Sequence, residues 1–189
     1  MTEASHVGDL VTRLALSHPE VSFRFINNGQ VKLHTSGNGN LKDVIYHIYG
    51  REIASNLIEV DFERKGIHIT GYLGKPLISR GNRNFENYFV DGRYIKSSII
   101  SKAIEDGYKD FTMQHKYPFV VLYLDVNTEH VDVNVHPTKM DVRFNNQQEI
   151  YNTLFAAVDD GLHERELIPE VTLDDIKIPE EPKDCKSNF

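Results

Sequence analysis

A rigid corner that ends in a lysine interrupts an alternating segment of the sequence, VDVNVHPTKMDVRF at residues 131–144. Valines alternate with polar residues before the corner, which is typical of a half-buried strand. Pro137 then removes a backbone donor and fixes the chain, and it biases His136 toward an extended conformation. Lys139 is therefore held on a stiff loop, where its compact charge is suited to a phosphate. The residue types alone leave open whether the corner binds phosphate or is a solvated turn.

A second feature is the basic segment at residues 75–102, in a chain that is acidic overall. The segment has six basic side chains against two acidic ones, a local charge of +4, whereas the whole chain carries −7 at pH 7. Most of the acidity lies in residues 159–189, which hold ten acidic and four basic side chains. A local basic field attracts a phosphate backbone even when the net charge is negative. A solvated face has the same composition, so both interpretations stay open.

Other chemistries find little support in the sequence. No two of the nine histidines have the four-residue spacing of a helical zinc pair, and the single cysteine, Cys185, lies in a polar tail. The chain has no Gly-x-Ser-x-Gly nucleophile motif and no Walker loop. Two glycines in SGNGNLKD precede a helical pattern, and they fit a helix-starting turn better than a phosphate loop. The sequence therefore predicts no metal site.

The composition is that of a folded domain of ordinary size. The chain has 189 residues, of which 40% are hydrophobic, and this is enough to form a core. It has no apolar run close to the roughly 18 residues of a membrane span, and no basic-then-apolar signal region. A single cysteine excludes an internal disulfide. These features predict a protein of the cytoplasm or another reducing compartment, outside the membrane.

Hydrophobic periodicity predicts the elements that must position these residues. Apolar side chains at helical spacing predict helices over residues 3–17, from about 41 toward 50, over 97–111 and from 146 onward. Alternation predicts hairpins over 21–35 and 57–73, a strand with a tight turn at 91–92, and an apolar central strand over 117–126 that pairs with 131–135. In the hairpin over 57–73, a two-residue Lys65-Gly66 turn pairs Phe62 with Ile69. Asn146 and Glu149 form a pair like a capping box at the start of the last helix. The order of these elements predicts an α+β fold with a mainly antiparallel sheet and helices on one face.

The loop of the hairpin over 21–35 decides which side chains share a face. A two-residue Asn-Gly turn would place Phe25 opposite Lys32, so that the two apolar faces disagree. A three-residue loop at 27–29 pairs Phe25 with Val31 instead, and it puts a glycine at the left-handed position. The sequence therefore predicts the longer loop.

The corner and three further segments resemble the MutL family of DNA mismatch-repair proteins. VDVNVHPTKMDVRF resembles the family's Asn-Val-His-Pro-x-Lys segment, and RLALSHPEVSFRFINNG, NYFVDGRYIKSSIISKAI and PFVVLYLDV resemble other family segments in the same order. The likeness covers about residues 2–165 and is to the transducer, the second subdomain of the family's N-terminal GHKL ATPase region. Nothing in the chain resembles the nucleotide-binding subdomain, with its Asn-bearing helix, Asp-x-Gly-x-Gly loop and Gly-Phe-Arg-Gly-Glu-Ala signature.

The resemblance implies a role for the corner. Lys139 stands where the family's transducer presents a lysine to the γ-phosphate of ATP, which the neighbouring subdomain holds, and His136 and Pro137 would position it. A positioned cation stabilises the negative charge that develops in phosphoryl transfer. The longer protein would then be an ATPase that uses ATP and Mg²⁺, while this chain alone would hold no cofactor and would not be an enzyme. A lysine from a second subdomain also allows domain closure to report bound ATP.

The resemblance further implies part of a non-specific DNA-binding groove. Arg93, Lys96 and Lys102 are the candidate phosphate contacts. Ser98 occupies a position where some relatives carry an arginine, and Lys102, one helical turn later, is the candidate replacement. The implied partners are the chain's own ATPase subdomain, DNA, a MutS-type mismatch recognition protein and a second copy in a homodimer.

The implied domain limits are a helix at 1–20 that continues from the ATPase subdomain, a transducer domain at 21–166 and an acidic linker or tail at 167–189. The implied fold is like that of a ribosomal protein and contains a left-handed β-α-β crossover, against the usual right-handed rule. Two alternatives remain. A stand-alone RNA-binding domain of ribosomal-protein type predicts a strongly basic chain, and a structural interaction module predicts no consequence of changing Lys139.

Overall fold

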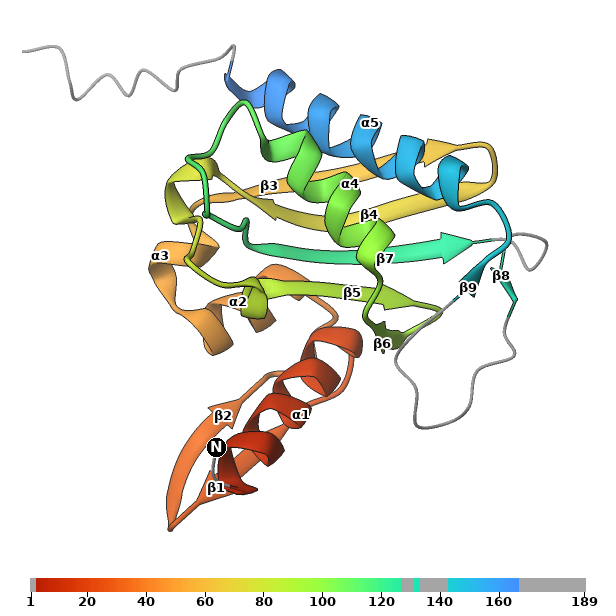
Figure 1. Ribbon diagram of the computed structural model, residues 1–189. Coiled ribbons are helices and arrows are strands. Elements are labelled where there is room, and N and C mark those ends of the chain that lie inside the picture. The colour runs from red at the N-terminus through yellow and green to blue at the C-terminus, as the bar shows by residue number, and fades with distance from the viewer. Residues whose placement is uncertain (1–2, 127–130, 133–142, 167–189) are drawn as a thin grey trace, which may run out of the picture.

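The computed structural model describes residues 3–126, 131–132 and 143–166. Within these residues a five-stranded sheet forms the centre of the molecule (Figure 1). In spatial order its strands are β3 (Leu57–Arg64), β4 (Ile67–Gly74), β7 (Val120–Val126), β5 (Glu86–Val90) and β6 (Arg93–Ile95).

Helices and two small sheets surround this centre. The helices are α1 (Glu3–Ser17), α2 (Leu41–Tyr49), α3 (Arg51–Ala54), α4 (Ser98–Tyr108) and α5 (Gln147–Glu166), with 3₁₀ turns η1 (Pro76–Ile78) and η2 (Arg83–Phe85). The small sheets pair β1 (Arg24–Asn27) with β2 (Gln30–His34), and β8 (Val131–Asp132) with β9 (Arg143–Phe144).

The main sheet is antiparallel except where β5 and β7 lie side by side. These two strands are parallel, and Tyr88 is aligned with Leu122. A parallel pair needs a crossover connection, which β6 and α4 supply. The predicted α+β class with a mainly antiparallel sheet is therefore confirmed, while the left hand of the crossover stays a prediction.

Helices cover both faces of the sheet, whereas the sequence predicted one. α4 and α5 pack side by side over the first face (Figure 1), where they share a core with Ile69 and Leu122. α1 and α2 pack on the second face, where Leu16 and Ile45 belong to one buried cluster with Val121. The correction follows from β7, because a strand that is apolar on both faces needs cover on both.

The β1–β2 hairpin closes through a two-residue Asn-Gly turn with positive φ at both residues, so the predicted three-residue loop is wrong. Ile26 pairs with Val31, and the register then shifts so that Phe25 pairs with Leu33. Lys32 is the extra residue of this β-bulge. The bulge brings Phe25 and Leu33 onto one face without lengthening the loop, and it leaves Ile26 and Val31 exposed.

The β3–β4 hairpin confirms its predicted register. Lys65 and Gly66 form the two-residue turn, with φ of 53° and 74°. Phe62 is aligned with Ile69 as expected. Positive φ at both positions matches the right-handed twist of the strands that the turn joins.

The helix starts also follow the sequence. Asn146 precedes α5, where its Oδ1 accepts the Glu149 amide at 3.2 Å and its amide donates to Glu149 Oε2 at 3.0 Å. Asn40 caps α2 by accepting the Asp43 amide at 3.1 Å. These side chains satisfy backbone donors that the first turn of a helix leaves free.

β8 does not pair with β7 as predicted, because both edges of β7 are occupied by β4 and β5. β8 instead pairs with β9, with Val131 opposite Phe144. The prediction that 131–135 extends the hairpin of β7 is therefore wrong for 131–132. Residues 133–135 lie outside the described residues.

Gly71 occupies a crowded position inside the main sheet. Its φ is 131°, a backbone conformation that residues other than glycine rarely adopt. It is aligned with Val60 on β3 and with Leu122 on β7. A β-carbon there would overlap the carbonyl oxygen of Val121 and lie 3.1 Å from the Cα of Leu122. The pairing of β4 with both β3 and β7 therefore requires glycine at this position.

The predicted domain limits stay a prediction. At the N-terminal limit, Ala15 and Leu16 of α1 are fully buried in the cluster on the second face of the sheet. The predicted tail at 167–189 lies outside the described residues.

Candidate functional site

The three candidate DNA contacts lie on one continuous stretch of chain. Arg93 is on β6, Lys96 lies between β6 and α4, and Lys102 is on α4. All three side chains are exposed. In the part of the chain that the structure describes, none of them is held in an ion pair. They are therefore available to a phosphate backbone.

The basic segment is less basic in space than in sequence. Arg83 donates two hydrogen bonds to Glu105, at 2.6 and 2.9 Å. Glu105 lies just beyond residues 75–102, so the local charge of +4 did not include it. Arg80 is half-buried and its guanidinium lies 6.0 Å from the ring centroid of Phe85. The positive field is therefore concentrated around β6 and the start of α4.

A cleft of about 990 Å³ lies between α1, β5, β6 and the first turns of α4. Lys96 and Ser98 line it near the N-terminus of α4, and Asp9 and Arg13 line it from α1. Ser97 caps the helix by accepting the Ile100 amide at 3.5 Å. A helix N-terminus carries a positive partial charge and free backbone donors. The cleft therefore joins the candidate DNA surface to a helix end that favours anions.

Glu86 is a buried carboxyl at this cleft. Glu86 is only 6% exposed. Its Oε2 accepts a hydrogen bond from the Tyr88 hydroxyl at 2.5 Å. Its Oε1 is buried and has no hydrogen-bond partner. Burial raises the pKa of Glu86 to about 7, and the Tyr88 hydrogen bond and the Arg83 charge only partly offset this. A large share of Glu86 is therefore neutral near pH 7.

The sequence interpretation missed Glu86 and Arg13. Glu86 could have been found from the sequence, because strand alternation places it on the same face of β5 as Tyr88 and Val90. Arg13 had no signal, because its guanidinium meets the ring of Tyr94 at 4.2 Å only after α1 packs against β6. This cation–π contact fixes a basic side chain at the cleft.

Lys139, His136 and Pro137 lie outside the described residues. The structure does describe the strands on either side of their loop, β8 and β9, which pair with each other. Phe144 of β9 is buried in the core beneath α4 and α5. The two strands lie beyond the carboxyl end of β7 (Figure 1). The described strands that flank residues 133–142 are therefore paired with each other, and Lys139 stays a prediction.

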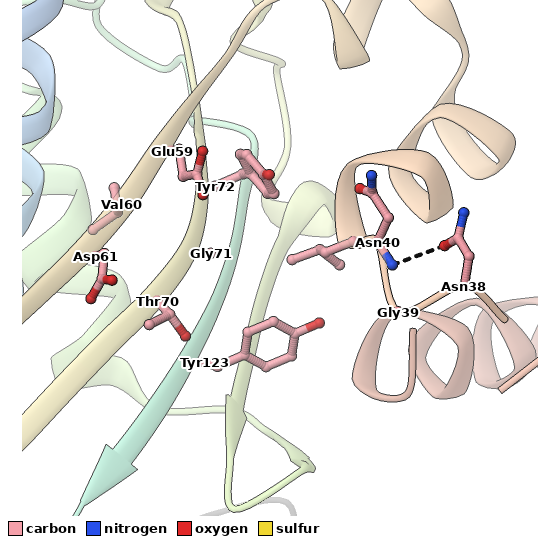
Figure 2. A pocket seen from close by; sticks show the side chains of 11 residues that line it. Asn38, Gly39, Asn40, Glu59, Val60, Asp61, Thr70, Gly71, Tyr72 and Tyr123 are labelled. Carbon is pink, nitrogen blue, oxygen red and sulfur yellow. Dashed lines mark hydrogen bonds between the residues drawn. The ribbon is translucent and has the colours of Figure 1, made fainter. Parts of the chain in front are cut away.

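A second hollow, of about 500 Å³, lies between β3, β4 and β7 of the main sheet and residues 38–41. Figure 2 shows Glu59 and Asp61 on β3 beside it, with Tyr72 and Tyr123 on neighbouring strands. The exposed carboxylates repel a phosphate backbone. This hollow is therefore a poor candidate for nucleic acid.

Residues 3–126, 131–132 and 143–166 contain neither a metal-binding cluster nor a membrane-spanning helix. No group of three or more histidine, cysteine, aspartate or glutamate side chains in these ranges is placed to hold a metal ion. No helix there is long and apolar enough to cross a membrane.

The sequence is similar to known mismatch-repair proteins. Residues 45–163 match the family model described as DNA mismatch repair protein, C-terminal domain. DNA mismatch repair protein MutL of Agathobacter rectalis is 58% identical over 178 residues, which is 94% of this chain and 27% of that protein. MutL of Clostridium botulinum is 43% identical over 162 residues, or 86% of this chain and 24% of that protein. The chain thus spans less than a third of the length of these relatives.

Solved structures show the same fold. The N-terminal domain of a DNA repair protein aligns with a TM-score of 0.71 at 21% identity, over 86% of this chain and 54% of that one. A mutant of the Aquifex aeolicus MutL ATPase domain aligns with a TM-score of 0.57 at 18% identity, over 82% of this chain and 51% of that one. The family model and the identity with MutL sequences give the decisive result: this chain belongs to the MutL family of DNA mismatch repair proteins.

Proposed function

We propose that this chain is the transducer part of a MutL-type ATPase, in which Lys139 reaches the γ-phosphate of ATP bound by another part of a longer protein. Membership of the MutL family carries the proposal. The proposal is also supported by the fold, because this chain aligns with about half of the N-terminal domain of a DNA repair protein. The family model is described as a C-terminal domain, whereas the solved structure is an N-terminal domain. Both descriptions fit a transducer, because a transducer is the C-terminal half of an N-terminal ATPase region.

The proposed role of Lys139 is electrostatic. Phosphoryl transfer spreads negative charge over the γ-phosphate oxygens, and a cation already in position stabilises it without reorganising solvent. The pairing of β8 with β9 supports such positioning, because these two strands flank the segment that contains Lys139. ATP and Mg²⁺ would be bound by the longer protein. Closure of the two parts around ATP would then carry the signal to DNA and to partners.

An exposed apolar surface supports docking against the ATPase subdomain. α1 exposes Leu10 at 56%, and the β1–β2 hairpin exposes Ile26 and Val31 at 50% each. α1 and the hairpin are in contact, and large apolar side chains exposed on both elements support contact with another protein part. In Figure 1 these elements project from the layer of the main sheet. A MutS-type protein and a second copy of the longer protein are further proposed partners.

We also propose that β6 and the start of α4 bind DNA without sequence preference. Arg93, Lys96 and Lys102 are exposed there, and Arg13 lies at the same cleft. Contacts of this kind neutralise phosphates and release counterions, so they make binding sensitive to salt. Lys102 takes the place of the arginine that some relatives carry at the position of Ser98.

Changing Arg93, Lys96 and Lys102 together to glutamate is expected to weaken DNA binding to a similar degree for all sequences. It should also reduce the slope of log affinity against log salt by about three, since roughly one unit is lost per phosphate contact. Fluorescence anisotropy with two unrelated duplexes at several salt concentrations measures both quantities. The matched control reverses three exposed basic residues elsewhere, Arg24, Lys32 and Lys42, and should retain the slope. If the first variant binds DNA with unchanged affinity at low salt, Arg93, Lys96 and Lys102 are not the DNA contacts.

The 189-residue chain is expected to bind ATP no more tightly than about millimolar, the weak end of the affinity scale. The physical reason is that the adenine and Mg²⁺ sites belong to the proposed ATPase subdomain. Isothermal titration calorimetry with ATP and Mg²⁺ measures this directly. Stoichiometric binding at micromolar ATP would contradict the division of the site between two parts.

A further inference from the structure

We infer that the cleft at the start of α4 holds one backbone phosphate of a DNA strand, and that it does so tightly only while the Glu86 carboxyl is protonated. The inference deepens the proposed DNA binding and rests on it. It assigns the strand a fixed anion subsite inside the otherwise exposed basic surface.

The cleft has the elements of an anion site. α4 has 11 residues, and its N-terminus opens into the cleft through Ser97 and Ser98. Lys96 precedes this turn, and Arg13 lines the same cleft from α1, over the ring of Tyr94. Backbone donors, a helix dipole and two basic side chains together favour a phosphate group. The cleft of about 990 Å³ is large enough to admit a phosphodiester with its sugars.

Glu86 is the independent observation that points to a ligand. It lines the cleft and is 6% exposed, yet its Oε1 has no partner. Tyr88 donates to the other oxygen only. Burying an ionised carboxyl with one unpaired oxygen is much more costly than burying the neutral acid. The carboxyl is therefore poised between two charge states at a wall of the cleft.

The charge of the Glu86 carboxyl affects the binding of a phosphate, and a bound phosphate affects the carboxyl. An ionised Glu86 repels a phosphate placed at the start of α4, and the low polarity around a buried group strengthens that repulsion. A phosphate in the cleft in turn raises the pKa of Glu86, which burial already raises to about 7. Binding therefore takes up a proton, and affinity falls as the pH rises through 7.

Other groups near Glu86 either keep their charge near pH 7 or keep their effect on binding in the Glu86→Gln variant, which separates that effect from the effect of Glu86. Glu105 is ion-paired with Arg83, and Tyr88 has its pKa raised by burial and stays neutral. His6, on α1, is exposed and is the one histidine among the described residues that lines the cleft. The charged and titratable side chains that face Glu86 or share its cleft are Tyr88 on β5, Arg83 in η2, Lys96 after β6, Tyr94 on β6, Glu105 on α4, Tyr49 on α2, and His6, Asp9 and Arg13 on α1.

The test uses the 189-residue chain and a labelled single-stranded oligonucleotide of about twenty nucleotides at low, constant ionic strength. The wild-type affinity should fall about tenfold between about pH 6 and about pH 8, because one linked proton with a pKa near 7 is lost over this range. Glu86→Gln keeps the shape and remains neutral, so its affinity should change less than about twofold. Glu63→Gln, an exposed carboxyl on β3, is the matched control and should behave as wild type.

Calorimetry of the wild type in two buffers of different ionisation enthalpy gives a second measurement that needs no variant. It should report net proton uptake near pH 7 on binding the oligonucleotide. Inorganic phosphate at the same pH should bind far more weakly, because a free ion lacks the neighbouring contacts of a strand. A wild-type pH profile in Glu86→Gln, or the absence of proton uptake, overturns the inference and leaves DNA binding intact. Failure of the wild type to bind the oligonucleotide at any pH overturns the DNA-binding proposal as well.

Discussion

Replacing Gly71 by alanine is expected to lower the free energy of unfolding by about 3 kcal/mol or more. A β-carbon at this position overlaps the carbonyl oxygen of Val121, which is backbone in the neighbouring strand and has little freedom to move. The positive φ of 131° adds strain for any residue with a side chain. Since a domain of this kind has only about 5–15 kcal/mol of stability, much of it would be lost. Urea unfolding followed by circular dichroism measures the change.

Gly29→Ala is the matched control for this prediction. Gly29 also has a positive φ, of 73°, but nothing lies within 4 Å of the position that its β-carbon would take. Its replacement should therefore lower stability by only about 1 kcal/mol, which reflects the backbone strain alone. If both variants unfold at the same urea concentration, the close approach between β4 and β7 does not determine the effect.

Lys139→Ala in the complete ATPase region is expected to lower kcat by roughly 10²-fold or more, as the loss of one transition-state donor does elsewhere. KM should change less than kcat if the charge acts mainly in the transition state. In the 189-residue chain the same change should alter stability by no more than about 0.5 kcal/mol. Steady-state ATP hydrolysis and urea unfolding measure the two effects separately.

Two comparisons make the Lys139 prediction specific. Lys139→Arg should restore activity only in part, since a planar guanidinium does not reproduce a compact ammonium group. Lys109→Ala removes an exposed lysine just after α4 and should leave kcat unchanged. Hydrolysis at the unaltered rate by Lys139→Ala would mean that the corner at residues 136–139 is only a turn.

The sequence predicts strands and helix ends well because these depend on neighbouring residues. The Lys65-Gly66 turn and the Asn146 cap are local, and the structure has both. It predicts strand partners poorly, because alternation identifies a strand without saying which edge is free. β8 was assigned to β7 for this reason, although β4 and β5 already occupy both edges of β7.

The same limit applies to the candidate site. The motif that contains Lys139 and the exposed residues Arg93, Lys96 and Lys102 were visible in the sequence. The cleft was not, because it forms only when α1 packs beside β6 and brings Arg13 over Tyr94. The count of charges in residues 75–102 also failed locally, since the Glu105 carboxylate neutralises Arg83. Pairings between distant segments follow from tertiary packing and leave little trace in a single sequence.

The acidic side of β3 has a consequence for aggregation. β3 is an edge strand of eight residues, and an edge of this length is a template for pairing with another copy. Glu59, Asp61 and Glu63 are exposed along it on one face. Two copies that paired through this edge in antiparallel fashion would bring carboxylates opposite carboxylates, which is unfavourable. Like-charge repulsion therefore disfavours extension of the sheet through this edge.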